Sequence, residues 1–248
     1  MTDAAISIRD LVIRFRMSYD RVYSMKERAR AVAQRFVGGR EPEYFEALRG
    51  VSFEAHAGDI VGLIGANGSG KTTFLRATSG IYAPDAGEVT SSGRISTLLS
   101  LGTGFNNKLS GRDNIMVGGL LIGMTPAEIE KRVPEIVHFA GVEKFVDVPM
   151  KYYSKGMIAR LSFAIVLAMQ PDIVLIDEVF SVGDLAFKEK SERAMHDLLS
   201  RARIQLIVTH SLSLVREHCN RALLFDSGKI VADGAPDEVV DLYESRAS

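Results

Sequence analysis

This sequence of 248 residues has a single cysteine, and its positive and negative charges nearly balance. Its single cysteine, Cys219, cannot form an internal disulfide, which is compatible with a reducing compartment. Lysine and arginine number 30 against 31 aspartates and glutamates, so no overall charge attracts nucleic acid and no such partner is expected. Hydrophobic residues at 46% and charged residues at 25% are typical of a globular protein without long disordered tails.

Long hydrophobic runs are also lacking. The apolar stretch at 164–176 is interrupted by Gln170, Pro171 and Asp172, which leaves two pieces far below the ~20 residues of a membrane-spanning helix. The start of the chain has no basic region followed by an apolar run, so no secretory signal is expected. Any association with a membrane is therefore expected to be peripheral.

Short runs rich in β-branched residues alternate with helical patterns along the chain. Strands are expected at 6–15, 47–56, 60–65, 94–101, 172–178, 204–210 and 221–234. Helices are expected from Lys71 to near Gly80 and across about 103–168, where one helical face carries Ile129, Val133, Ile136 and Val137. This succession predicts a single α/β domain over 1–248, with a mostly parallel sheet and a helical insert between its early and late strands.

The stretch "GANGSGKT" at 65–72 fits the phosphate-loop pattern in full and lies between a predicted strand and a predicted helix. The residues expected to contact nucleotide phosphates are Gly65, Ala66, Asn67, Gly68, Ser69, Gly70, Lys71, Thr72 and Thr73. Lys71 supplies a point charge to the β- and γ-phosphates, and the Thr72 hydroxyl can bind Mg²⁺. The alternatives are a plain glycine-rich turn and a dinucleotide site, but the latter has no use for Lys71 and Thr72.

Polar side chains end two of the predicted strands. Asp177 closes "IVLID" and can orient the water shell of Mg²⁺, and Glu178 can polarise an attacking water. His210 closes "LIVTH", where a neutral imidazole can hydrogen-bond the γ-phosphate or that water. The alternative for the acidic pair is a simple strand end. The other histidines are interpreted as structural or exposed: His56, His138, His196 and His218.

With Ser154-Lys155-Gly156 added, the order of motifs resembles the ATP-binding cassette (ABC) ATPases along nearly the entire chain. The resemblance implies a P-loop NTPase (RecA-like) core, an antiparallel β subdomain and an α-helical signature subdomain. Ser154 is expected to cap a helix that begins near Gly156. In the family this turn closes over the γ-phosphate held by another protomer, and the loop after the glutamate, which ends at Asp184, lies nearby. A homodimer with ATP at its interface is therefore implied, and an ordinary capped helix is the alternative.

Within the family the chain resembles the ATPase subunits of bacterial polysaccharide exporters. The resemblance rests on "YSKGM", "DEVFSVGD", "LGTGFNNKLSGRDNI" and a basic helical insertion at 17–46. It implies a lipid-linked O-antigen, capsule or teichoic acid chain as substrate, a separate integral-membrane permease as partner, and a peripheral location at the cytoplasmic face of the inner membrane. The chain stops at Ser248, so the sugar-binding domain of some relatives is not expected.

Some assignments stay open. Most ABC ATPases have a glutamine in the loop that corresponds to "STLLSLGTGF"; this chain has none, and Ser100 is a candidate substitute. The adenine-stacking aromatic is expected at Phe15, with Tyr44 and Phe45 as alternatives and a core role for Phe15 as another. The insertion is either a solvated helix or a membrane or partner contact. The rival functions are a soluble ABC ATPase acting on DNA or ribosomes and a P-loop kinase.

Overall fold

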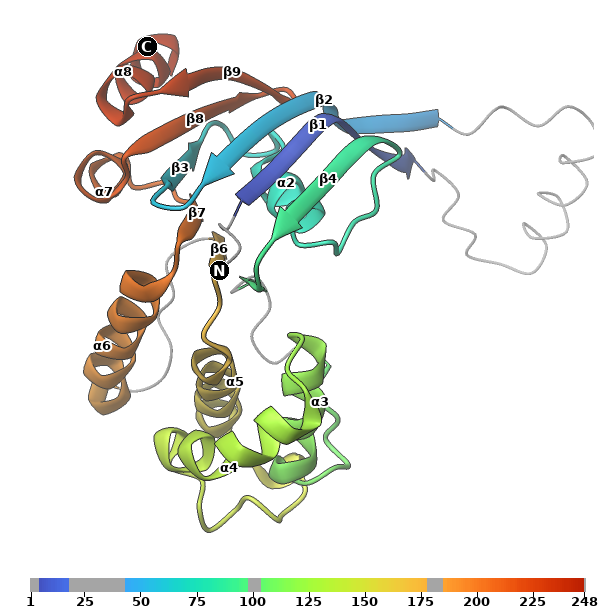
Figure 1. Cartoon of the computed structure of the whole chain (residues 1–248), viewed down its shortest axis with the longest axis vertical. Coiled ribbons are helices and arrows are strands. Elements are labelled where there is room, and N and C mark those ends of the chain that lie inside the picture. Colours follow the sequence, from blue (N-terminus) through green and yellow to red (C-terminus); the bar gives the residue numbers. More distant parts are fainter. Residues whose placement is uncertain (1–4, 18–42, 98–103, 178–184, 248) are drawn as a thin grey trace, which may run out of the picture.

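Two β-sheets and several helices form the chain (Figure 1). The computed structural model describes residues 5–17, 43–97, 104–177 and 185–247. An antiparallel sheet has the order β2-β1-β4, made of β1 (Ala5–Met17), β2 (Glu43–His56) and β4 (Ala86–Ser92). A second sheet has the order β5-β6-β7-β3-β8-β9, made of β5 (Ile95–Thr97), β6 (Ile173–Asp177), β7 (Ile204–Val208), β3 (Ile60–Ile64), β8 (Arg221–Asp226) and β9 (Lys229–Gly234). Neighbouring strands of this sheet are parallel, except that β9 runs antiparallel to β8.

Both faces of the six-stranded sheet are covered, which explains the continuous apolar runs of its central strands. Side chains alternate across a strand, so Val61 and Leu63 enter the core shared with the antiparallel sheet, while Ile64 enters the core on the other face. The first core also contains α2 (Lys71–Thr78). The second is closed by α6 (Leu185–Arg201), α7 (Leu212–His218) and α8 (Pro236–Ala247).

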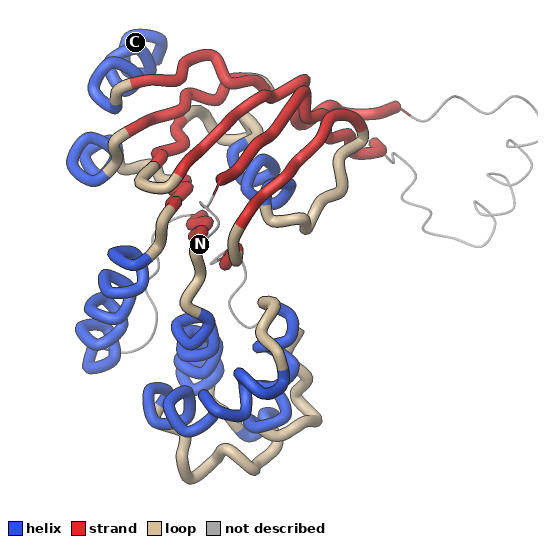
Figure 2. The backbone as a smooth tube through the Cα atoms, in the orientation of Figure 1, coloured by secondary structure: helices blue, strands red, loops and turns tan. Residues whose placement is uncertain are grey.

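The remaining helices form a separate unit with its own hydrophobic core, apart from the sheets (Figure 2). It consists of α3 (Gly111–Leu121), α4 (Pro126–Ala140), the short 3₁₀ helix η1 (Met150–Tyr152) and α5 (Lys155–Met169). The apolar stripe predicted for α4 is confirmed, because Ile129, Ile136 and Val137 are buried in this core and Val133 packs against it. The unit is called the helical subdomain below.

The predicted α/β architecture with its helical insert is confirmed, but the sequence pattern missed β4, whose residues are mostly exposed and show no apolar alternation, and other differences lie at element ends. β1 and β2 pair as far as Met17 and Glu43, so the two ends of the predicted 17–46 insertion are strand. The sequence pattern missed this because residues 43–45 are exposed and lack the alternation of a half-buried strand. The predicted strand 221–234 is a hairpin that turns at Ser227 and Gly228, both at positive φ. The rest of the insertion, 18–42, lies outside the described residues.

None of the helices in the described part of the chain combines the length and the apolar character that crossing a bilayer requires.

Candidate functional site

The phosphate loop connects β3 to α2, as the sequence predicts. Gly65 and Gly70 have φ values of 137° and 109°, in the region that favours glycine. A Cβ at Gly65 would overlap the carbonyl oxygen of Phe225, and one at Gly70 would lie 2.9 Å from the carbonyl oxygen of Ala47. The loop is therefore held tightly between β2 and β8, and close backbone packing requires glycine at Gly65 and Gly70.

Lys71 opens α2 and is buried, with 6% of its surface exposed. Its Nζ donates hydrogen bonds to the carbonyl oxygens of Gly65 at 2.7 Å and Ala66 at 2.9 Å, and to Ser69 Oγ at 3.4 Å. These oxygens compensate for the loss of water around the ammonium group. The loop thus holds a positive charge in place beside the start of a helix, where backbone N–H groups favour anions.

A cavity of about 240 Å³ opens beside this loop. The described residues that line it are Phe15, Phe45, Ala47, Asn67, Gly68, Ser69, Gly70, Lys71, Thr72, Thr73, Asp177, Val208 and His210. Asp177 pairs in register with Val208, so the carboxyl ends of the parallel strands β6 and β7 bring Asp177 and His210 to the same edge. Most of the predicted site residues therefore surround one cavity. Gly65 and Ala66 belong to the loop without lining the cavity.

The register of the β1–β2 pair decides which of the three aromatic candidates face the cavity. Phe15 is directly opposite Phe45 on the β1–β2 pair, and opposite residues of an antiparallel pair point to the same face. Tyr44 is opposite Arg16, on the other face, and does not line the cavity. Phe15 is 38% exposed, which rules out the alternative of a core side chain. Phe15 and Phe45 thus remain as the aromatic candidates at this cavity.

Ser154 caps α5, as predicted: its Oγ accepts a hydrogen bond from the backbone N–H of Met157 at 3.1 Å. The far end of α5, at Met169, leads into β6. Fifteen helical residues span about 22 Å, so the capped end points away from the sheet. Neither Ser154 nor Gly156 is among the described residues that line the nucleotide cavity of the same chain.

Sequence reasoning overlooked Tyr153, which anchors the Ser154 turn. Its buried hydroxyl donates to the carbonyl oxygen of Phe145 at 2.6 Å, and burial, with a further contribution from the negative charge of Asp147, raises the pKa of this phenol. A Cβ at Gly111 would overlap that hydroxyl, so α3 packs directly on the tyrosine. The aromatic residue in "YSKGM" therefore joins the turn to the core of the helical subdomain, a contact that local spacing does not reveal.

Asn114 was likewise overlooked. It is fully buried, and its Nδ2 donates to the carbonyl oxygens of Asn106, Leu109 and Ser110 while its Oδ1 accepts from the Asn106 backbone N–H. One side chain thus organises the turn that enters α3. These carbonyl groups lie four to eight positions before Asn114, so only the folded turn, and no local pattern, brings them to its amide.

Several predicted residues lie outside the described part of the chain: Glu178, Asp184 and Ser100. Their roles remain predictions from the sequence.

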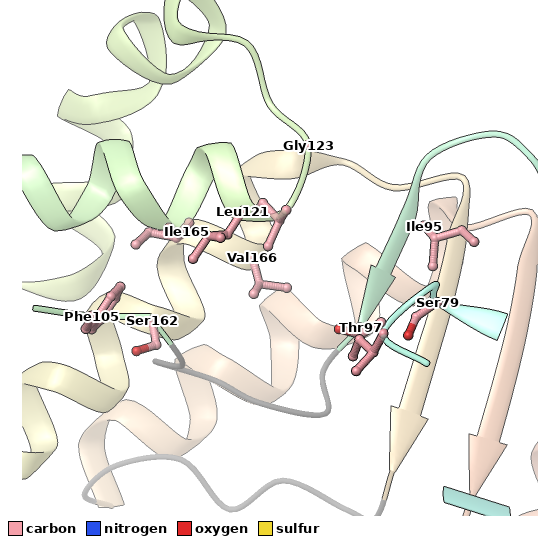
Figure 3. A pocket seen from close by; sticks show the side chains of 12 residues that line it. Ser79, Ile95, Thr97, Phe105, Leu121, Gly123, Ser162, Ile165 and Val166 are labelled. Carbon is pink, nitrogen blue, oxygen red and sulfur yellow. The ribbon is translucent and has the colours of Figure 1, made fainter. Parts of the chain in front are cut away.

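A second, mostly apolar cavity of about 550 Å³ separates the sheets from the helical subdomain (Figure 3). Ile95 and Thr97 of β5 line one side, and Leu121, Ile165 and Val166 line the other. Leu121, which lines this cavity, is 65% exposed.

Comparison with known proteins agrees with this geometry. Residues 48–181, more than half of the chain, match the family model described as ABC transporter. An O-antigen export system ATP-binding protein, RfbB of Myxococcus xanthus, is 42% identical over 84% of this chain and 48% of the relative. RfbE of Yersinia enterocolitica, another such protein, is 42% identical over 78% of this chain and 82% of the relative. The teichoic acids export ATP-binding protein TagH of Lactococcus lactis is 40% identical over 81% of this chain and 43% of the relative. The chain thus spans about half the length of some relatives and most of others.

Solved structures share the fold. The ATP-binding subunit of an ABC transporter superposes with a TM-score of 0.67 at 20% identity, covering 98% of this chain and 95% of that one. A dimeric ATP-binding cassette in a post-hydrolysis state, bound to ADP and Pi, superposes with a TM-score of 0.64 at 19% identity, covering 93% of this chain and 98% of that one. The order of the motifs, the cavity that brings the phosphate loop, Asp177 and His210 together, and the family match lead to one conclusion: the chain belongs to the ABC transporter family.

Proposed function

We propose that the chain is the ATP-hydrolysing subunit of an ABC exporter that moves a lipid-linked polysaccharide of the O-antigen, capsule or teichoic acid type. The observation that carries the proposal is the cavity in which the buried Lys71, the Asp177 carboxylate and the His210 imidazole meet beside a phosphate loop. The names of the similar export proteins support the substrate class.

The residues in the cavity suit a nucleoside triphosphate. Lys71 exchanges its bonds to the loop carbonyls for bonds to the β- and γ-phosphates, with little loss because it is already desolvated. His210 hydrogen-bonds the γ-phosphate or the attacking water, and Glu178, outside the described residues, polarises that water. Phe15, with Phe45 on the same face, stacks on the adenine.

The site also suits Mg²⁺. Thr72 and Asp177 line the same cavity and offer a hydroxyl and a carboxylate oxygen, which are the kinds of ligand that Mg²⁺ prefers. Within the described residues no cluster of three or more histidine, cysteine or acidic side chains could hold a metal. This matches a Mg²⁺ ion held by one or two protein oxygens and the substrate phosphates. When bound, the ion would neutralise part of the negative charge of the phosphates.

A second copy of the chain completes the site. Ser154 and Gly156 start α5 at the end that points away from the sheet, so their anion-binding turn serves the ATP held by the partner. Asp184, outside the described residues, belongs to the loop proposed to lie at the same interface. The working form is thus a homodimer with ATP between the copies.

The transport partner is a separate integral-membrane permease. We place its contact at the apolar cavity between β5 and α3, whose exposed rim residue Leu121 would be covered by a docked segment (Figure 3). The chain then works peripherally at the cytoplasmic face of the inner membrane.

Two measurements test this function. The purified chain should hydrolyse ATP, and Lys71→Ala should abolish that activity whereas Lys108→Ala, an exposed lysine away from the cavity, should not. Cells that lack the chain should lose a surface polysaccharide and accumulate its lipid-linked form inside, with rescue by the wild type and by Lys108→Ala only. An unchanged cell surface together with ATPase activity stimulated by DNA or ribosomes would favour the soluble rival, and transfer of phosphate to an acceptor would favour a kinase.

A further inference from the structure

An aromatic residue outside the nucleotide cavity holds one of the residues inside it. Tyr82, in the loop between α2 and β4, meets Phe15 with ring centroids 5.4 Å apart and ring planes at 77°. This is the edge-to-face arrangement that aromatic pairs favour. Tyr82 does not line the cavity, whereas Phe15 does. Tyr82 therefore contacts the Phe15 ring outside the cavity, and the part of the ring that lines the cavity stays accessible.

Tyr82 is itself held by α2. Arg76 Nη1 donates a hydrogen bond to Tyr82 Oη at 3.0 Å, and the Arg76 guanidinium carbon lies 5.8 Å from the centre of the Tyr82 ring. The backbone N–H of Tyr82 donates to the carbonyl oxygen of Arg76 at 3.2 Å. The tyrosine also packs against the main hydrophobic core. The backbone, the hydroxyl and the ring of Tyr82 are thus each held by a separate contact.

The same helix begins at Lys71, in the phosphate loop, and carries Arg76 in its last turn. Its eight residues span about 12 Å, so one short rigid element reaches from the phosphate end of the cavity to the residues behind Phe15. A half-exposed phenylalanine at a strand end can occupy several rotamers unless neighbours restrict it. Arg76 and Tyr82 provide that restriction.

We propose that Tyr82, fixed by Arg76, is a positioning residue that orients Phe15 for stacking on the nucleotide base and so sets base affinity without touching the nucleotide. The inference rests on the proposed ATP site, in which Phe15 stacks on adenine. It makes two separable claims: that Phe15 binds the base, and that Tyr82 acts through Phe15.

The test compares a ligand with a base and one without. The dissociation constants of the non-hydrolysable ATP analogue AMP-PNP and of tripolyphosphate, both with Mg²⁺, are measured by calorimetry on the full chain. Tyr82→Leu should raise the Kd of AMP-PNP about fivefold, in the range of one aromatic pair, and leave that of tripolyphosphate unchanged. Phe15→Leu should have at least the same effect, and the double variant should be no weaker than Phe15→Leu alone. Tyr82→Phe keeps the ring edge and loses only the bond to Arg76, so a smaller rise, about twofold, is expected.

Tyr44→Leu is the matched control, because this aromatic residue lies on the other face of β2 and should leave both constants unchanged. An unchanged AMP-PNP Kd in Tyr82→Leu, beside a raised one in Phe15→Leu, would overturn the positioning role and leave the proposed site intact. An equal weakening of tripolyphosphate, or additive effects in the double variant, would overturn it too. If Phe15→Leu bound AMP-PNP like the wild type, the base-stacking assignment would fail first, and this inference with it.

Discussion

Arg94, just ahead of β5, forms an ion pair with Glu128 in the first turn of α4, with 2.7 Å between Nη2 and Oε1. The pair joins the six-stranded sheet to the helical subdomain, whose hydrophobic core is separate. Glu128 also accepts a bond from the backbone N–H of Thr125 at 2.8 Å, which completes a capping box. The bond from Thr125 and then the charge-assisted bond from Arg94 lower the pKa of the Glu128 carboxyl to about 2.

This geometry predicts a pH dependence that Glu128→Gln removes. Because the folded pKa lies below the value of 4.5 expected for an unperturbed glutamate, the contribution of Glu128 is complete above pH 4.5 and is lost as the pH falls toward 2. Glutamine keeps the capping acceptor and loses the charge. Urea unfolding midpoints of the two proteins should differ most at pH 6, differ less at pH 3, and converge only as the pH approaches 2. A difference that stays constant over this range would contradict the ion-pair contribution.

Asn114→Ala should lower the free energy of unfolding by roughly 2–3 kcal/mol, because several buried backbone groups lose their hydrogen-bonding partner at once. Asn107→Ala is the matched control, since Asn107 is exposed, and should stay within about 0.5 kcal/mol of the wild type. Urea titration followed by circular dichroism measures both. Equal effects of the two substitutions would show that the Asn114 network does not stabilise the fold.

How far the sequence predicts this molecule depends on the range over which each contact acts. The burial of β3 was predictable from its apolar run, and the phosphate loop and the Ser154 cap from short motifs whose residues act on their own neighbourhood. Tyr82 contacts Phe15, which lies 67 positions earlier in the sequence, and no local sequence pattern predicts such a pair. Tyr153 belongs to the signature stretch "YSKGM", but its packing against Gly111 follows only from the way α3 and α5 meet.

Glu178→Gln should reduce ATP turnover by roughly a hundredfold or more, the range for loss of a general base, and leave ATP binding intact. Without hydrolysis the ATP-bound homodimer should accumulate, and light scattering coupled to gel filtration with and without ATP would detect it. Asp172→Asn, at a carboxylate on the opposite end of β6 that accepts a bond from the Arg94 backbone N–H, is the control and should keep turnover within about twofold of the wild type. A Glu178→Gln protein with wild-type turnover would contradict the assignment.

The composite site predicts complementation between two inactive variants. Ser154→Asp keeps a good helix cap, so the fold should survive, but its negative charge would face the triphosphate of the partner. Ser154→Asn keeps a neutral cap and should retain much of the activity. Lys71→Ala and Ser154→Asp should each be inactive alone, since every site in either homodimer lacks one essential group.

In a mixture of these two chains, half of the dimers are mixed, and each mixed dimer contains one intact site formed by the Lys71 loop of one copy and the Ser154 turn of the other. If the sites act independently, an equal mixture should recover about a quarter of the wild-type ATPase rate; coupling between sites would lower that figure without abolishing it. If Ser154 instead served the nucleotide of its own chain, every mixed dimer would have both defects in separate copies, each copy would remain inactive, and no activity would return. Recovery on mixing therefore separates a shared nucleotide site from a self-contained one by a rate measurement alone.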